Sequence, residues 1–314
     1  FAQGSWKPWP SLKLVLAGRM TYNRIENKPG ASGFGLLFTP RAAIIYSPLR
    51  RRLVLKAIYS EAFKDPTDAE EFGVIDQYLD AYRSNGLRPE KVRNIEGSAE
   101  WQPSERLTTS GSLYEARYSD VVSYGYPLQP DGTPVQGCFI GCQQYQNRDE
   151  IRVRGTQLTA QYTLARSELW GNYTHTEPFQ THARDFFGNP MFDAAGQRID
   201  EIRVHGIAGD HVNAGVEAGW ATRWRSSLRF HWVSRRPLGP GTTLPTSPLT
   251  RVPSYITVDA AVSYADLLPN LTLQLTAFNL LNKNYSDPQT DVTTVPSVLQ
   301  AGRTVYLRLI YHLR

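Results

Sequence analysis

Histidine can bind metals or move protons near neutral pH, and it occurs six times in the 314 residues. The positions are His175, His182, His205, His211, His231 and His312. They form no His-Glu-x-x-His zinc motif, and no serine lies in a nucleophile-elbow motif. We therefore predict that the chain is not an enzyme.

Four of these histidines, His175, His182, His205 and His211, fall in or beside a long polar stretch over 177–210. Imidazoles in such a loop either contact a bound iron chelate or haem, or are simply solvated. We favour solvation and keep the four as candidate ligand-binding residues.

A second candidate site is an acidic segment that follows the alternating run 53–60. It contains Asp65, Asp68, Glu70, Glu71, Asp76 and Asp80. Carboxylates are the ligands that calcium prefers, but the regular spacing of a calcium loop is missing. We predict a solvated loop, with Asp65, Asp68, Glu70 and Glu71 as metal-ligand candidates.

The two cysteines, Cys138 and Cys142, lie in a polar loop as Gly-Cys-Phe-Ile-Gly-Cys. Structural zinc needs four ligands, so two thiols make a poor zinc site. In an exported protein a local disulfide is expected instead.

Basic residues give a net charge of only +5, and they are scattered. The one run, Arg50-Arg-Arg52, follows Ser47-Pro48 and is interpreted as a solvated turn, because no basic stripe or aromatic platform accompanies it. We expect no nucleic-acid partner and no cofactor.

Long segments that alternate apolar and polar residues must position these side chains. Twelve such segments are predicted as strands. They are 12–22, 36–46, 53–60, 92–101, 107–118, 152–164, 168–176, 212–221, 226–234, 254–264, 271–279 and 302–314. The phase changes within 152–164, which suggests a bulge near Gly155.

The last of these segments shows the two faces clearly. Val305, Leu307, Leu309 and Leu313 alternate with Arg308 and His312. Strands of about ten residues with a polar, charged second face are typical of a transmembrane barrel with a wet lumen, whereas soluble sandwich strands are shorter. No apolar run is long enough for a transmembrane helix.

Connection length supports the same interpretation. Short connections at 47–51, 102–106, 165–167, 222–225 and 265–270 alternate along the chain with long ones at 62–90, 119–149, 177–210, 235–253 and 283–301. Up-and-down barrels of outer membranes place short turns on the periplasmic side and long loops outside.

Tryptophan placement points to a membrane interface. Six of the seven lie in or beside the short connections: Trp6, Trp9, Trp101, Trp170, Trp220 and Trp224. Aromatic girdles mark the two interfaces of membrane barrels, so we predict one at the short-turn end.

Four local patterns resemble one family, the TonB-dependent outer-membrane receptors. They are Tyr59-Ser-Glu-Ala-Phe-Lys-Asp-Pro-Thr-Asp-Ala-Glu70, Leu87-Arg-Pro-Glu-Lys-Val-Arg-Asn-Ile-Glu-Gly97, Ala277-Phe-Asn-Leu-Leu-Asn-Lys-Asn-Tyr-Ser-Asp-Pro288, which contains Asn279-Leu-Leu-Asn-Lys-Asn-Tyr285, and Gly302-Arg-Thr-Val-Tyr306. The resemblance covers essentially the whole chain, 1–314, as the C-terminal part of an antiparallel up-and-down barrel. It implies about twelve strands of a 22-stranded barrel, with the plug domain and the first strands absent.

The resemblance also implies a location in the outer membrane and active uptake of a scarce ligand, such as a ferric siderophore, haem or cobalamin. The implied partners are TonB, acting through the missing plug, and outer-membrane lipid and lipopolysaccharide, with the receptor a monomer. A passive porin and an outer-membrane barrel hydrolase are the alternative functions. We expect this chain by itself to form an open curved sheet in preference to a smaller strained barrel, and not to transport alone.

Overall fold

The computed structural model describes residues 1–23, 35–49, 52–67, 70, 87–125, 144–182, 189–193, 195–238, 251–289 and 297–311. The strands are β1 (Ala2–Trp9), β2 (Leu12–Asn23), β3 (Gly35–Tyr46), β4 (Leu53–Lys64), β5 (Glu90–Ser104), β6 (Leu107–Gly125), β7 (Gln144–Thr163), β8 (Ser167–Thr181), β9 (Glu201–Arg203), β10 (Asp210–Gly219), β11 (Trp224–Val233), β12 (Arg236–Pro237), β13 (Arg251–Val252), β14 (Tyr255–Leu268), β15 (Leu271–Phe278), β16 (Ser286–Pro288), β17 (Ser297–Leu299) and β18 (Thr304–Tyr311). All twelve predicted strands are present.

One large antiparallel sheet contains fourteen of these strands. Its order is β1-β2-β3-β4-β5-β6-β7-β8-β10-β11-β14-β15-β18, with β9 paired to β8, so neighbours along the chain are neighbours in space. This is the predicted meander. No helix in the described parts of the chain is long and apolar enough to cross a membrane.

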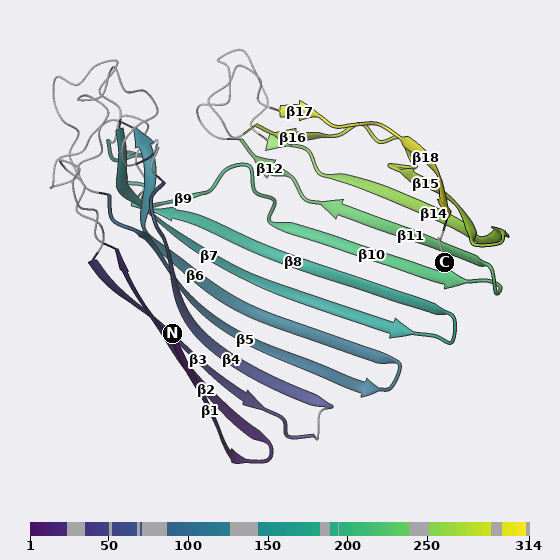
Figure 1. Ribbon diagram of the computed structural model, residues 1–314. Coiled ribbons are helices and arrows are strands. Elements are labelled where there is room, and N and C mark those ends of the chain that lie inside the picture. Colours follow the sequence, from purple (N-terminus) through teal and green to yellow (C-terminus); the bar gives the residue numbers. More distant parts are fainter. Residues whose placement is uncertain are drawn as a thin grey trace.

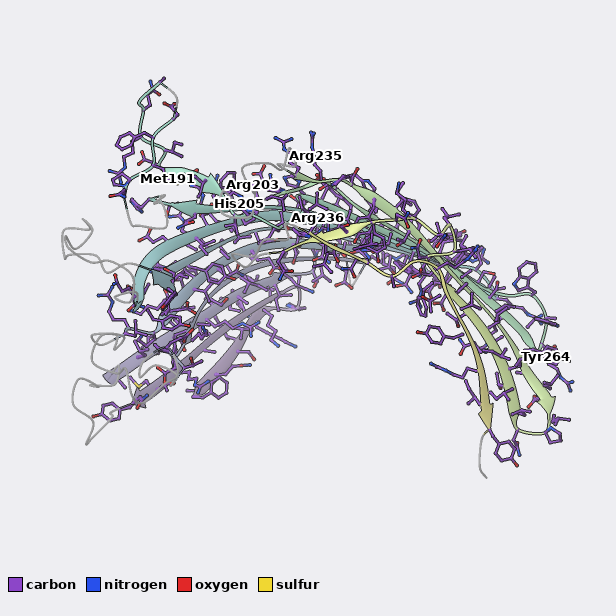
Figure 2. All side chains as sticks on the ribbon, turned by 90° about the horizontal axis from the view of Figure 1, so that it is seen from above. Met191, Arg203, His205, Arg235, Arg236 and Tyr264 are labelled. Carbon is purple, nitrogen blue, oxygen red and sulfur yellow. The ribbon has the colours of Figure 1, made fainter. Side chains whose placement is uncertain are left out.

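The short turns all lie at one end of the strands, and the small sheets β12-β13 and β16-β17 lie at the opposite end (Figure 1). Seen from above, the sheet is an arc, and no pairing between β1 and β18 closes it (Figure 2). The expected open curved sheet is therefore confirmed.

Strand register gives the sheet two chemically different faces. Residues directly opposite each other in an antiparallel pair lie on the same face, so a row can be followed from strand to strand. One row across ten strands is apolar throughout: Leu12, Tyr46, Leu55, Ala99, Gly111, Leu158, Tyr173, Val212, Trp232 and Ile256. We call this side the outer face.

The adjacent row belongs to the other side, the inner face. It carries Lys13, Ile45, Lys56, Ser98, Ser112, Gln157, Thr174 and His211. At the C-terminal end, Val305, Leu307 and Leu309 lie on the outer face and Arg308 on the inner face opposite Gln274, as predicted. Leu313 and His312 lie outside the described residues.

The predicted bulge near Gly155 is wrong. Pairing of β7 with both neighbours continues without a shift through Gly155, and the irregularity of the β6–β7 pair lies between Tyr118 and Val122. The phase change has another cause. On the outer face of β7, apolar Leu158 gives way to Arg154 and Arg152, so the outer face itself changes from apolar to charged.

The aromatic girdle needs one correction. Trp101 and Trp224 lie on the outer face near the short turns, where the Trp224 ring contacts Tyr264 at 4.8 Å. Trp170 instead lies on the inner face, opposite Gln161 and Gly215. Its indole lies so close to Gly215 that a Cβ there would come within 2.7 Å of the ring, so Trp170 fills inner space and does not meet lipid.

The two faces predict opposite responses to charge at neighbouring positions. Leu158→Arg places a cation in the middle of the apolar outer face and is expected to cost about 2–4 kcal/mol. Gln157→Arg changes the inner face and should have little effect. Denaturant unfolding of the membrane-embedded protein in lipid vesicles measures both, and equal costs would contradict the assignment of faces.

Candidate functional site

The inner face carries a group of aromatic and cationic side chains at the edge of the sheet away from the short turns. We call His211, His231, Tyr255, Tyr285 and Arg236 the lumen cluster. β10 supplies His211, β11 supplies His231 and β14 supplies Tyr255, and the register places all three on the inner face. They share that face because they stand at alternate, polar positions of amphipathic strands.

Ring contacts connect the cluster. Ring centroids lie 6.3 Å apart between His211 and His231, 6.0 Å between His231 and Tyr255, and 4.2 Å between Tyr255 and Tyr285. The last pair is stacked, with planes 28° apart. Burial, together with the carboxylates of Asp287 and Asp259, raises the pKa of the Tyr285 hydroxyl, so it stays protonated at neutral pH.

A chain of amides orients His231. Nδ2 of Asn213 donates to Oδ1 of Asn172 at 2.9 Å, and Oδ1 of Asn213 lies within hydrogen-bond distance of Nδ1 of His231. All three residues belong to one inner row across β8, β10 and β11. The imidazole is therefore held in a fixed orientation.

Arg236 is the brace of the cluster. The residue is 5% exposed, and its guanidinium donates to Oδ1 of Asp287, to the carbonyl of Ser286 at 2.8 Å and to the carbonyl of Pro253 at 3.5 Å. It also lies 5.1 Å from the centre of the Tyr255 ring. One buried cation thus connects β12, β16 and the start of β14.

The Asn279-Leu-Leu-Asn-Lys-Asn-Tyr285 motif forms the turn that leads from β15 toward this cluster. Asn279 and Asn282 both have positive φ, 48° and 51°, a conformation that asparagine tolerates better than most residues. Asn279 exchanges hydrogen bonds with the backbone of Lys283, and Oδ1 of Asn282 accepts from the backbone nitrogen of Arg303 at 2.9 Å. The motif therefore sets the start of β18 as well as the position of Tyr285.

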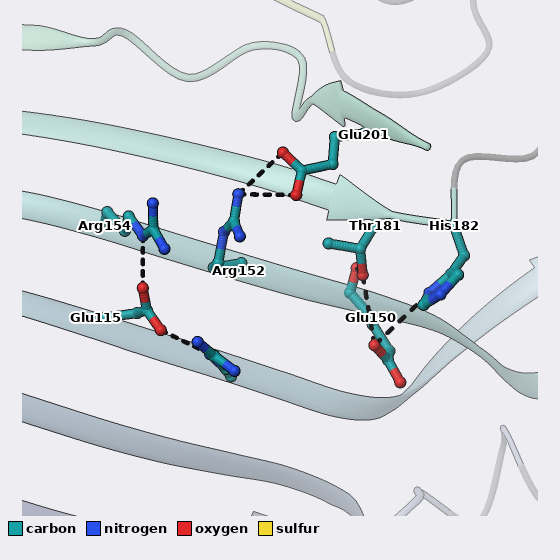
Figure 3. Close-up of polar contacts among 8 residues, drawn as sticks. Glu115, Glu150, Arg152, Arg154, Thr181, His182 and Glu201 are labelled. Atoms are coloured by element: carbon teal, nitrogen blue, oxygen red, sulfur yellow. Dashed lines mark hydrogen bonds and ion pairs between the residues drawn. The ribbon is translucent and has the colours of Figure 1, made fainter. Parts of the chain in front are cut away.

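The outer face carries a different group of polar residues above its apolar rows (Figure 3). Glu115 pairs with Arg117 and Arg154, Arg152 pairs with Glu201, and Glu61 pairs with Arg93. We call these seven residues the charged belt. Its arginines are mostly well exposed, so its ion pairs contribute little stability. Because charge on the lipid face of a barrel is costly, we expect the belt to lie where the outer face leaves the lipid.

The four candidate histidines do not form one site. His175 lies on the outer face beside Asp210 at 2.8 Å, and His182 is exposed near Glu150 at 3.7 Å. His205 lies in the connection between β9 and β10, and His211 lies on the inner face. The stretch 177–210 is also less of a loop than predicted, because β8 extends to Thr181 and β9 pairs beside it.

The acidic candidates are engaged with the protein where they are described. Oδ2 of Asp65 accepts from Asn23 at 3.1 Å, while Glu70 exchanges hydrogen bonds with Thr67 and pairs with Lys64 at 3.6 Å. Asp68, Glu71, Cys138 and Cys142 lie outside the described residues. No group of three or more His, Cys, Asp or Glu suited to a metal occurs among the residues that are described.

Sequence reasoning did not select His231, Tyr255, Tyr285 or Arg236. The alternation of the strand 226–234 places Arg229 and His231 on its polar face, which was a usable signal. Arg236 and Tyr285 lie in connections, where no periodicity indicates which way a side chain points.

Comparison with known proteins decides the family. Residues 1–280 match the family model described as TonB dependent receptor-like, beta-barrel. This chain belongs to that family. The membership places it in the outer membrane, as predicted, and it agrees with the amphipathic sheet. No curated protein sequence matches the chain.

Solved structures of low identity share the fold of this TonB-dependent receptor barrel. The FrpB iron transporter of Neisseria meningitidis has a TM-score of 0.71 at 17% identity, and the ferric enterobactin receptor PfeA of Pseudomonas aeruginosa has 0.70 at 16%. The ferric-catecholate import receptor Fiu of Escherichia coli K12 has 0.69 at 15%. The alignments cover 98% of this chain but only 44%, 43% and 43% of those chains, so it spans less than half their length.

Removing the brace should loosen the lumen cluster. Arg236→Met keeps the length of the side chain but loses hydrogen bonds of a charged group, each worth roughly 1.5–3 kcal/mol. Amide exchange should become faster in 251–255 and 285–289. The exposed neighbour Arg235 is the control, since Arg235→Met should leave exchange unchanged. Identical exchange in both variants would contradict the role of Arg236.

His205 predicts a response to acid in the connection between β9 and β10. Both ring nitrogens are buried and have no hydrogen-bond partner among the described residues, and burial lowers the pKa of the ring below its usual value of about 6.5. The packed connection therefore holds the ring in its neutral form at neutral pH. Its stability relative to the opened form falls as the pH drops below about 6.5, because the opened form binds the proton more readily.

Hydrogen exchange of residues 204–209, corrected for the intrinsic effect of pH, measures this opening. The backbone nitrogen of Gly206, which donates to Pro237 at 2.8 Å, should lose protection between about pH 7.5 and pH 5. His205→Phe cannot titrate and should remove the pH dependence. Equal protection at both pH values in the unmodified protein would refute the predicted role of His205.

Proposed function

We propose that this barrel is part of an outer-membrane receptor that takes up a scarce, large metal chelate, such as a ferric siderophore. The observation that carries the proposal is the lumen cluster on the inner face of a sheet with an apolar outer face. Stacked tyrosines offer flat apolar surface with polar tips, and oriented imidazoles offer hydrogen bonds. Together they suit a chelate that presents flat conjugated groups and polar edges.

The position of the cluster, at the strand ends opposite the short turns, supports uptake from outside the cell. Strands of family barrels have short turns on the periplasmic side, and the cluster lies at the opposite edge. A ligand arriving from outside would therefore meet it early. The names of the structural relatives, which include receptors for ferric enterobactin and ferric catecholates, make iron chelates the first class to test.

Coupling to TonB is the second part of the proposal. The inner face below the cluster is polar and carries an open groove of about 740 Å³ whose lining includes Glu168, Glu217, Arg225 and Gln274. Such a wall suits a plug domain with a polar surface, through which TonB would act. We also propose that the receptor is a monomer and that the charged belt lies at the level of lipopolysaccharide head groups.

The test is uptake of radiolabelled iron by cells in which the receptor that carries this barrel is the sole one for the siderophore supplied. Accumulation should require TonB and should fall at least about tenfold in Tyr255→Leu/Tyr285→Leu, which loses the stacked pair. The control variant Tyr311→Leu, which changes an aromatic residue on the outer face of β18, should accumulate iron normally. Accumulation that persists without TonB would indicate a passive pore and overturn the proposal.

A further inference from the structure

Two imidazoles stand side by side on the inner wall of the barrel. His211 on β10 faces Val233, and His231 on β11 faces Asn213, so the two histidines are diagonal neighbours on adjacent strands. Their ring centroids are 6.3 Å apart, with planes 44° apart. A side-chain pair on two hydrogen-bonded strands is held by backbone geometry that a mobile loop cannot provide.

Hydrogen bonding determines which nitrogen of His231 is free. Because Nδ2 of Asn213 donates to Asn172, the atom of Asn213 that faces His231 is an acceptor oxygen. Nδ1 of His231 therefore carries the proton, and Nε2 is left with its lone pair. Histidines that bind metals are commonly held in this way, with the second nitrogen donating to a carbonyl or carboxylate oxygen.

We propose that His211 and His231 together bind a divalent late transition metal, with Cu²⁺ preferred over Ni²⁺ and Zn²⁺. Imidazole nitrogens suit these ions, and their affinity for a given site follows that order. With metal–nitrogen bonds of about 2.0–2.1 Å, two rings on one ion have centres roughly 5–6 Å apart. The present separation of the ring centroids is 6.3 Å, so binding one ion would require the two rings to move slightly closer together.

The pair supplies two ligands, so the metal would keep positions for water or for a chelator that arrives with it. A hexadentate ferric siderophore has no free position and would touch these rings without coordination. The inference thus extends the proposed function, on which its cargo role rests, to metal complexes with two exchangeable positions.

Copper binding to the untagged receptor, purified from outer membranes in detergent, tests the site directly. Titration with Cu²⁺ should produce an electron paramagnetic resonance spectrum with hyperfine splitting from two nitrogens. His211→Gln and His231→Gln should each weaken binding by at least about a hundredfold. Asn213→Leu keeps both ligands but frees the ring, and should weaken binding by about tenfold.

His182→Gln, which changes an exposed histidine elsewhere, should leave the titration unchanged. Heat-modifiable gel mobility identifies any variant that fails to fold. A copper spectrum that survives both His211→Gln and His231→Gln in folded protein would overturn the proposal, as would no binding by the unmodified receptor. Neither outcome bears on TonB-dependent iron uptake, so the two proposals fail separately.

Discussion

The structure depends on one constraint, the absence of water around the backbone inside a lipid layer. Every N–H and C=O there must find a partner in the protein, so a spanning sheet has to pair each strand along its whole length. The register from β2 to β14 meets this demand in the row that runs from Leu12 to Ile256, whereas β1 and β18, the end strands of the described sheet, are each paired on one side only. Because pairing fixes which residues share a row, the same constraint places apolar side chains on one face and polar ones on the other. The lumen cluster is one consequence of that sorting, since His211 and His231 stand at polar positions of strands whose other face meets lipid.

The charged belt shows where the constraint ends. On β7 the outer face passes from Leu158 through Thr156 to Arg154 and Arg152 while pairing continues without a shift. Above the lipid the outer face is free to carry charge, and the strands extend into water as ordinary antiparallel ribbons. Inside the barrel the requirement is different again. Arg236, a buried cation with carboxylate and carbonyl partners, ties the connections to the strands and keeps Tyr255 and Tyr285 in place.

The fold could be predicted from the sequence because side chains alternate between the two faces of each strand. Alternation in 302–314 identified the faces of β18, and the parity of short and long connections identified the meander. Gly155 shows the limit of this reasoning, because a change in which face is polar looks the same in sequence as a change in register. The lumen cluster could be predicted only in part. His211 was selected for its position near a polar stretch, but its partner His231 lies 20 residues further along the chain, across a turn. Arg236 and Tyr285 point inward because of the turn at Asn279 and the β12–β13 pair, and neither feature has a period.

The central claim is that the sheet has a lipid face and a water face, and that the outer one becomes aqueous between Leu158 and Arg154 without a change of register. Nitroxide labels placed one at a time at positions 152–163 of the membrane-embedded receptor, with Cys138 and Cys142 replaced by serine, test it most directly. Relaxation by oxygen reports contact with lipid, and relaxation by a water-soluble nickel complex reports contact with water. The account predicts oxygen contact at positions 158, 160 and 162 but not at 157, 159 and 161, and contact with the nickel complex at 152 and 154. Oxygen contact at odd-numbered positions between 152 and 156, or no alternation along the whole segment, would contradict the account.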